Sequence, residues 1–103
     1  MDWAEAASGF SAMGSDARLQ VLRVLVRAGT DGLSVNQIQT RTGIAPSTLA
    51  HHLKFMAAAG LIEQEKTGRT IQNWAALDHL EALAAFILSE CCADADKKAA
   101  NDG

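Results

Sequence analysis

The stretch Gly43-Ile44-Ala45-Pro46-Ser47-Thr48-Leu49-Ala50-His51-His52-Leu53-Lys54 decides how the rest of the chain is interpreted. Pro46 suits a first helical position, because its ring presets φ and its missing N–H would have no helical partner there. At about 100° per residue, the apolar side chains fall on one stripe and a small, polar or cationic set falls opposite. The stripe is Leu49, Leu53 and Met56, and the opposite set is Ser47, His51, Lys54 and Ala58. The pattern predicts a helix with one face in the core.

The surrounding sequence is free of acidic residues. No Asp or Glu occurs from Gly32 to Ile62, although the chain carries 12 of them. A surface that approaches phosphates has to omit carboxylates. Ser34 is expected to cap a shorter helix over Val35–Arg41, and Thr42-Gly43 to turn into the helix that begins at Pro46. This order predicts a helix-turn-helix, whose second helix presents its N-terminal residues to base edges.

A β-hairpin is predicted after this helix, with strands over Leu61–Lys66 and Thr70–Ala75. Thr67-Gly68-Arg69 would form a three-residue loop, with Gly68 at the position that takes a positive φ. Lys66 and Arg69 at the tip suit contact with phosphates or the minor groove, as in a wing. The alternative is that these two cations only keep the hairpin soluble and do not contact DNA.

The run from Ser47 to Lys54, followed by Ala59-Gly60-Leu61-Ile62 and a Gly-tipped hairpin, resembles the ArsR/SmtB family of winged-helix repressors. The resemblance covers the chain from about Phe10 to Cys92. Ala45 departs from it by replacing the usual Ser or Asn cap, and Ala50 by replacing a common Ser. The resemblance implies a mainly α fold with a small β-hairpin wing, a homodimer formed through the first and last helices, and repression at a double-stranded DNA operator with an inverted repeat.

The residues expected to contact DNA lie on both helices of the motif and on the wing. They are Gln37, Ser47, Thr48, His51, His52, Lys54, Lys66 and Arg69. Each residue alone is also typical of a solvated face, but their order after a turn and before a wing favours DNA contact. His52 lies about 60° from the Leu49 stripe, so a packed or hydrogen-bonded histidine is an equal alternative.

Three further helices are expected to frame the motif. The first is short, carries Trp3, Ala7 and Phe10, and is weakened by Ser8-Gly9. The second runs from about 16 to 28, between an N-cap at Ser15 and a stop at Gly29. The last opens with a capping box over Asp78-His79-Leu80-Glu81, and its apolar stripe is Leu80, Leu83, Ile87 and Cys91. We expect Trp74 to pack against this last helix.

Composition limits the remaining possibilities. With 103 residues, 49% of them hydrophobic and 20% charged, the chain is expected to form one domain over residues 1–93 and a flexible tail over 94–103. No signal pattern and no apolar run of membrane-spanning length is present, which predicts a cytoplasmic protein without a membrane partner. The net charge of −3 is unusual for a DNA-binding domain. Because the acidic residues cluster near the two ends, the layout permits specific DNA binding and discourages binding to DNA of any sequence.

Cys91 and Cys92 are the only cysteines. Neighbouring cysteines could not form a disulfide without distorting the backbone, so the alternatives are two buried apolar side chains, a redox sensor, or ligands for a thiophilic ion. In the family that this chain resembles, trivalent arsenic or antimony is held by cysteine thiolates. As(III) or Sb(III) is therefore the expected effector, with a third ligand from the other subunit or a non-protein group, unless a methylated arsenical needs only two thiolates.

Other functional classes have weaker support. A redox enzyme or metallochaperone built on the two cysteines would need a partner base or Cys-x-x-Cys spacing, and the sequence has neither. It also has no Ser/His/Asp set and no phosphate-binding Gly loop. We therefore expect no enzyme activity and no required cofactor. Zinc-type sensing is unsupported because Asp78-His79 is followed only by Glu81 and Glu90. A winged-helix module that binds protein instead of DNA is opposed by the acid-free motif.

Overall fold

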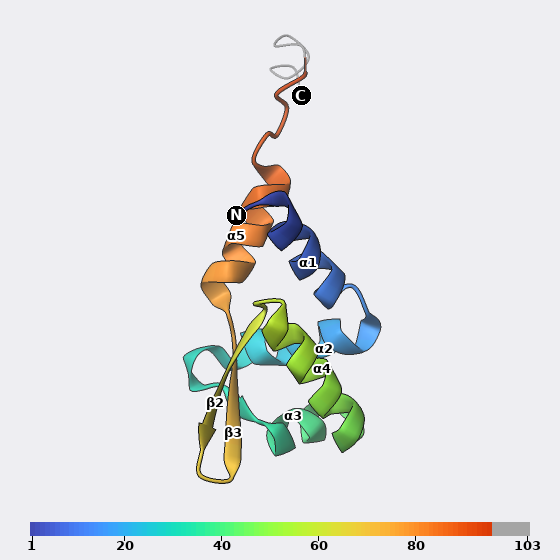
Figure 1. Cartoon of the computed structure of the whole chain (residues 1–103), viewed down its shortest axis with the longest axis vertical. Helices are drawn as coiled ribbons and strands as arrows, with labels where there is room; N and C mark the ends of the chain where they lie inside the picture. The colour runs from blue at the N-terminus through green and yellow to red at the C-terminus, as the bar shows by residue number, and fades with distance from the viewer. Residues whose placement is uncertain (96–103) are drawn as a thin grey trace.

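The computed structural model describes residues 1–95, which form five α-helices and a small sheet whose hairpin lies along one side of the helices (Figure 1). The helices are α1 Trp3–Met13, α2 Asp16–Ala28, α3 Val35–Thr42, α4 Pro46–Ala58 and α5 Leu77–Leu88. The strands are β1 Leu33–Ser34, β2 Ile62–Thr67 and β3 Thr70–Ala75, and a 3₁₀ turn, η1 Gly29–Asp31, links α2 to β1. This is the mainly α winged helix-turn-helix fold that was predicted.

Local capping sets the helix boundaries. Ser15 Oγ accepts a hydrogen bond from the N–H of Arg18 at 3.1 Å, and Gly29 with φ of 60° ends α2, as predicted. Asp2 caps α1 in the same way, by accepting from the N–H of Glu5 at 2.7 Å. These bonds satisfy backbone donors that have no partner inside a helix, so side-chain caps set where α1 and α2 begin.

The sheet attaches the wing to the helical body. All its strands are antiparallel in the order β1-β3-β2, and Leu33 pairs with Asn73. Asn73 is fully buried, and its Nδ2 donates to the carbonyl oxygen of Leu33 at 3.1 Å. Its Oδ1 accepts from Gln64 Nε2 at 2.7 Å. One buried amide therefore links all three strands.

The core lies where the helical stripes meet. It includes Leu49, Leu53 and Met56 of α4, as predicted, together with Leu25 of α2 and Leu83 of α5. Figure 1 shows α1 and α5 side by side at one end, and the hairpin tip, α3 and the start of α4 at the other. The expected dimer-forming helices and the expected DNA-binding elements thus occupy opposite ends of the molecule.

Several details of the predicted fold are wrong. Thr67 pairs with Thr70, so the hairpin loop has two residues, Gly68 and Arg69, instead of three. The helix α5 begins at Leu77, and its N-cap Ala76 makes no side-chain bond, so the capping box does not form. The indole N–H of Trp74 donates to the carbonyl oxygen of Thr30 at 2.9 Å, which places this side chain against η1 and not against the last helix.

The expected boundaries at the end of the chain are only partly covered. Residues 96–103, most of the predicted tail, lie outside the described residues, and the division at residue 93 stays a prediction. Within residues 1–95, no helix combines the length and apolar character needed to cross a membrane.

Candidate nucleic-acid interface

The helix α4 presents a polar face to solvent. Ser47, Thr48, His51 and Lys54 are all exposed, and Leu49 and Leu53 on the other side are buried. Because the apolar stripe fixes the rotation of the helix, the polar face has only one direction in which to point. Hydroxyl, imidazole and ammonium groups at these spacings are suitable donors and acceptors for base edges and phosphates.

The turn before α4 is held by a side chain. Gly43 takes the left-handed conformation with φ of 74°, and its N–H donates to the carbonyl oxygen of Gln39 at 2.7 Å. The hydroxyl of Thr42 donates to the carbonyl oxygen of Ile38 at 2.8 Å and accepts from the N–H of Ile44 at 3.3 Å. These bonds fix α4 relative to α3. Ala45 provides no side-chain cap for α4, as its departure from the family pattern predicted.

Gln37 lies exposed on the first turn of α3, but part of its side chain is already used. Its Oε1 accepts from the N–H of Ser34 at 2.9 Å, while Ser34 Oγ accepts from the N–H of Gln37 at 3.2 Å. The amide NH₂ remains as the group with which Gln37 would contact DNA. A Ser34 cap was predicted, but the reciprocal bond from the Ser34 N–H to Gln37 Oε1 was not.

His52 occupies a position between the core and the outer face. It is half-buried, and its Nδ1 is buried without a hydrogen-bond partner among the described residues. Its ring centroid is 6.2 Å from that of the exposed His51. This geometry fits the packed alternative better than full presentation to bases, and the prediction that His52 contacts DNA stays untested.

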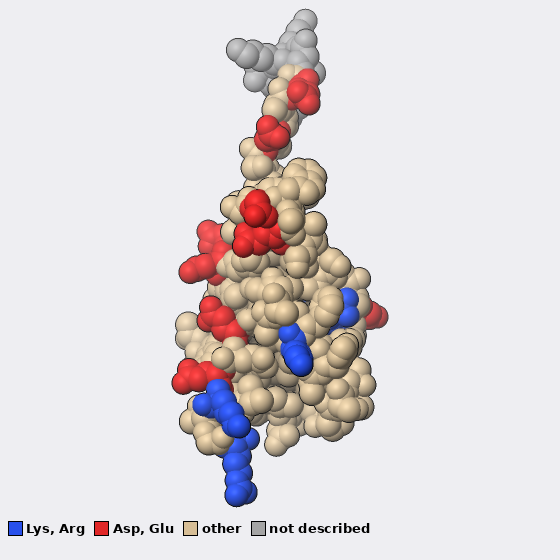
Figure 2. All heavy atoms as spheres, in the orientation of Figure 1, with Lys and Arg blue, Asp and Glu red and all other residues tan. Residues whose placement is uncertain are grey.

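The wing carries its positive charge at the tip. Lys66 pairs with Ile71 near the end of β2, and Arg69 lies in the turn, both exposed. Figure 2 shows Lys and Arg side chains at the lower end of the molecule, over the hairpin tip, and Asp and Glu side chains mostly at the left edge and above, toward α5. On this face the hairpin tip is cationic, whereas Lys and Arg side chains also lie over the middle of the molecule and Asp or Glu side chains lie directly above the tip.

A small hollow joins the wing to α3. It encloses about 170 Å³ between the hairpin tip and the start of α3, and Ser34, Asn36, Arg69 and Thr70 contribute to its walls. Arg69 is thereby brought close to a helix N-terminus, whose N–H groups favour anions. Asn36 also lines the next hollow along α3, together with Gln37 and Arg41. The sequence did not single out Asn36 or Arg41, because each alone has the pattern of a solvated helix residue.

The two cysteines lie beyond the last helix. Because α5 ends at Leu88, Cys91 is not on its apolar stripe, and both thiols are exposed in a single copy of the chain. Their Sγ atoms are 3.2 Å apart, and Cys92 has a φ of 65°. A side-chain hydrogen bond with Cys91 raises the pKa of Cys92, and desolvation adds to this effect. Within residues 1–95, no three His, Cys, Asp or Glu side chains gather into a metal site.

Comparisons with known proteins agree with this geometry. Residues 13–65 match the helix-turn-helix domain family, whereas no curated protein matches the chain. An ArsR-like transcriptional regulator from Rhodococcus sp. RHA1 is 30% identical, covers 96% of this chain and 90% of its own, and superposes with a TM-score of 0.74. HlyU from Vibrio cholerae N16961 is 26% identical over 89% of this chain and 99% of its own, with a TM-score of 0.69.

A third similar structure is described as a homodimer. It is the winged helix-turn-helix DNA-binding domain of a possible ArsR-family transcriptional regulator from Mycobacterium bovis. This domain is 26% identical, with a TM-score of 0.67, and covers 84% of this chain and 81% of its own. The similarity covers 84% of this chain in this structure and 96% in the regulator from Rhodococcus sp. RHA1.

Proposed function

This chain belongs to the ArsR family of winged helix-turn-helix transcriptional regulators, and from that premise we propose that it is a homodimeric repressor. It is a DNA-binding regulator and not an enzyme. The exposed polar face of α4, within an acid-free segment from Gly32 to Ile62, carries the proposal. Two such helices, about one helical turn or ~34 Å apart, would occupy the half-sites of an inverted repeat.

The exposed groups divide into two roles. Ser47, Thr48 and His51 near the start of α4 read base edges in the major groove, because the N-terminal part of a recognition helix enters deepest. Lys66 and Arg69 on the wing contact phosphates and so position the protein without reading sequence. Lys54, further along α4, completes the cationic side of this surface.

The test uses selection from random DNA, followed by gel-shift titration of the selected site. The wild type is expected to select an inverted repeat. The double variant Ser47→Ala/His51→Ala is expected to bind that site at least about 30-fold more weakly, since two base contacts contribute about 1–3 kcal/mol each. The control Ser11→Ala/Thr30→Ala changes exposed residues outside the motif and is expected to bind normally. Undiminished binding by the first variant would overturn the assignment of α4.

Dimer formation is supported by the apolar surface at the opposite end of the molecule. Trp3 on α1 is 79% exposed, and Ile87 and Leu88 on α5 are each 66% exposed. Trp3 meets Phe86 edge to face with centroids 5.6 Å apart, so the two helices present one continuous apolar face. Burying this surface is favourable, and a second copy of the chain would cover it. The similar domain from Mycobacterium bovis is homodimeric.

Sedimentation analysis tests the dimer. Ile87→Glu should shift the protein from dimer to monomer, because dimerisation would bury the new carboxylate. Leu19→Glu is the matched control, since Leu19 is also apolar and 52% exposed but lies on α2. A dimer that survives Ile87→Glu and is lost in Leu19→Glu would place the interface elsewhere.

We assign the effector to the exposed pair Cys91 and Cys92, with trivalent arsenic or antimony as the ligand. Thiolates are the ligands that such thiophilic ions prefer. With arsenous acid, each As–S bond forms as a thiol proton leaves together with a hydroxyl group of the acid as water, so no electron is transferred. Trivalent arsenic forms three bonds, and two of them go to the cysteine sulfurs. The third goes to a thiolate from the other subunit, to a non-protein ligand, or to the methyl group of a methylated arsenical.

The cysteine assignment is tested in the same gel-shift assay. Cys91→Ser/Cys92→Ser should bind the selected site normally and resist release by arsenite. Release of this variant by arsenite would remove the effector from the cysteines. Release of the wild type by an oxidant but not by arsenite would instead support the second candidate, an ArsR-family regulator whose exposed cysteines sense redox state.

A further inference from the structure

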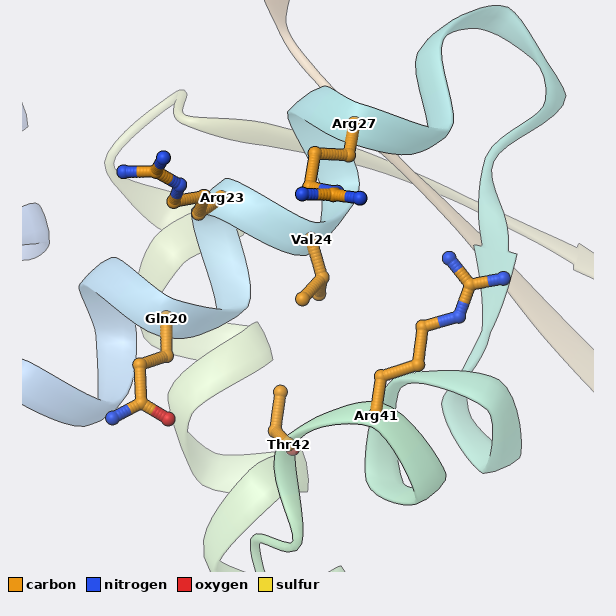
Figure 3. Close-up of a pocket in the computed structure, with 6 residues that line it drawn as sticks. All are labelled: Gln20, Arg23, Val24, Arg27, Arg41 and Thr42. Atoms are coloured by element: carbon orange, nitrogen blue, oxygen red, sulfur yellow. The ribbon is translucent and has the colours of Figure 1, made fainter.

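A cationic groove lies between α2 and α3, away from the cysteines (Figure 3). It has a volume of about 510 Å³ and is lined by Gln20, Arg23, Val24, Arg27, Arg41 and Thr42. Figure 3 shows Val24 and Thr42 pointing into the space from opposite helices, with the Arg27 and Arg41 side chains extending along one side of it and Arg23 directed away at the rim. The groove thus has an apolar floor and a cationic wall.

The charge of this groove is unbalanced. Three of the chain's nine Lys and Arg residues line it, and no Asp or Glu is among the lining residues. Guanidinium groups gathered on adjacent helices repel one another, and a concave wall concentrates their field. A bound anion would relieve this repulsion, because the one carboxylate hydrogen-bonded to a lining residue, Asp16, accepts from Gln20 Nε2 and from none of the guanidinium groups among the described residues.

We propose that the groove binds a small organic anion, with carboxylate or phosphate groups on a partly apolar body. Arg27 and Arg41 supply planar donor forks that match carboxylate and phosphate oxygens in pairs. Val24 offers the apolar contact, and Gln20 Nε2, which already donates to Asp16 Oδ1 at 2.7 Å, keeps one N–H for a further polar contact. The volume lies in the range of about 300–1,000 Å³ that is typical of small-molecule sites.

The position of the groove connects it to the DNA-binding helix. Its wall includes Thr42, whose hydroxyl holds the turn by accepting from the N–H of Ile44 at 3.3 Å. Arg41 precedes this residue, so a ligand that joins Arg41 to Arg27 would tie α3 to α2 beside the turn. The site is separate from the cysteine pair and would supply a second, anionic input.

Isothermal titration with citrate and with phenyl phosphate, at constant ionic strength, tests the proposal. The wild type should bind at least one of the two with saturation, and the preferred one identifies carboxylate or phosphate as the group recognised. Arg27→Gln and Arg41→Gln should each weaken this binding at least tenfold. Lys97→Gln removes one positive charge at a position with no assigned binding role and should leave binding unchanged.

Three outcomes would overturn the proposal. The first is that neither anion binds with saturation. The second is that Arg27→Gln and Arg41→Gln bind as tightly as the wild type. The third is that Lys97→Gln weakens binding as much as they do, which would indicate a general charge effect. A loss of DNA affinity in Arg27→Gln and Arg41→Gln without any anion bound by the wild type would assign the groove to the DNA backbone instead.

Discussion

Gly9 and Leu83 are in contact where α1 crosses α5, and a Cβ added at Gly9 would lie 2.8 Å from Leu83 Cδ1. Both residues are buried, and Leu83 is only 1% exposed. The glycine that makes α1 a weak helix in isolation is therefore the residue that lets the two helices approach. Its cost in helix propensity, up to about 1 kcal/mol, is offset by tertiary packing.

Gly9→Val is expected to lower the free energy of unfolding by about 1–3 kcal/mol, because extra methyl groups overpack the contact with Leu83. For a domain of this size each kcal/mol lowers Tm by about 4–8 °C. Ser8→Val, which adds the same side chain at the exposed neighbouring position, is expected to change stability by less than about 0.5 kcal/mol. Thermal unfolding followed by circular dichroism measures both, and equal Tm values for the two variants would contradict the contact.

Asn73→Leu is expected to lower the free energy of unfolding by about 1–3 kcal/mol, since it leaves the buried carbonyl oxygen of Leu33 without its partner. Gln64→Ala removes the partner on β2 and should cost less, because Gln64 is exposed and water can replace it. Urea unfolding of the two single variants and the double variant gives the coupling energy of the pair. Strictly additive effects would show that the bond between Asn73 and Gln64 contributes nothing to stability.

Much of this fold could be predicted from short-range signals. Ser15 and Gly29 bracket α2 at the observed residues, and Pro46 marks the start of α4, because caps and proline act through the local backbone. The two-residue strand β1 was not predicted. It exists because its backbone pairs with β3, where Leu33 lies opposite Asn73, a partner forty residues away whose side chain adds a buried hydrogen bond, and no local pattern carries that information.

The candidate site could be predicted only where it depends on short-range signals in the sequence. The exposed face of α4 follows from the periodicity of Leu49 and Leu53, which needs no knowledge of the rest of the fold. The grouping of Arg27 with Arg41 depends on how α2 packs against α3, so the sequence showed only separate cations on two polar faces. The placement of Trp74 failed for a similar reason, since its partner is a backbone oxygen in η1.

Lys66→Ala and Arg69→Ala are expected to weaken binding to the selected operator and to unrelated DNA by similar factors. Each lost phosphate contact should reduce the slope of log affinity against log salt concentration by about 0.9, or about 1.8 for a dimer. His51→Ala should instead weaken operator binding more than binding to unrelated DNA, because base contacts carry the specificity. Fluorescence anisotropy over a range of salt concentrations measures both. A wing variant that loses only operator affinity would show that the wing reads sequence.

Cys91→Ala is expected to speed the alkylation of Cys92 by iodoacetamide at pH 8. The thiolate is the reacting form, and the hydrogen bond with Cys91 raises the pKa of Cys92, so the wild-type thiol stays protonated to a higher pH. Removing that partner lowers the pKa and increases the thiolate fraction. The gain should shrink as the pH rises above both pKa values, where each protein is fully ionised. Cys91→Ser retains a hydrogen-bonding group and should react more slowly than Cys91→Ala. Mass spectrometry of the C-terminal peptide follows the rate at Cys92, and identical rates in the wild type and Cys91→Ala at pH 8 would show that the two thiols are not coupled.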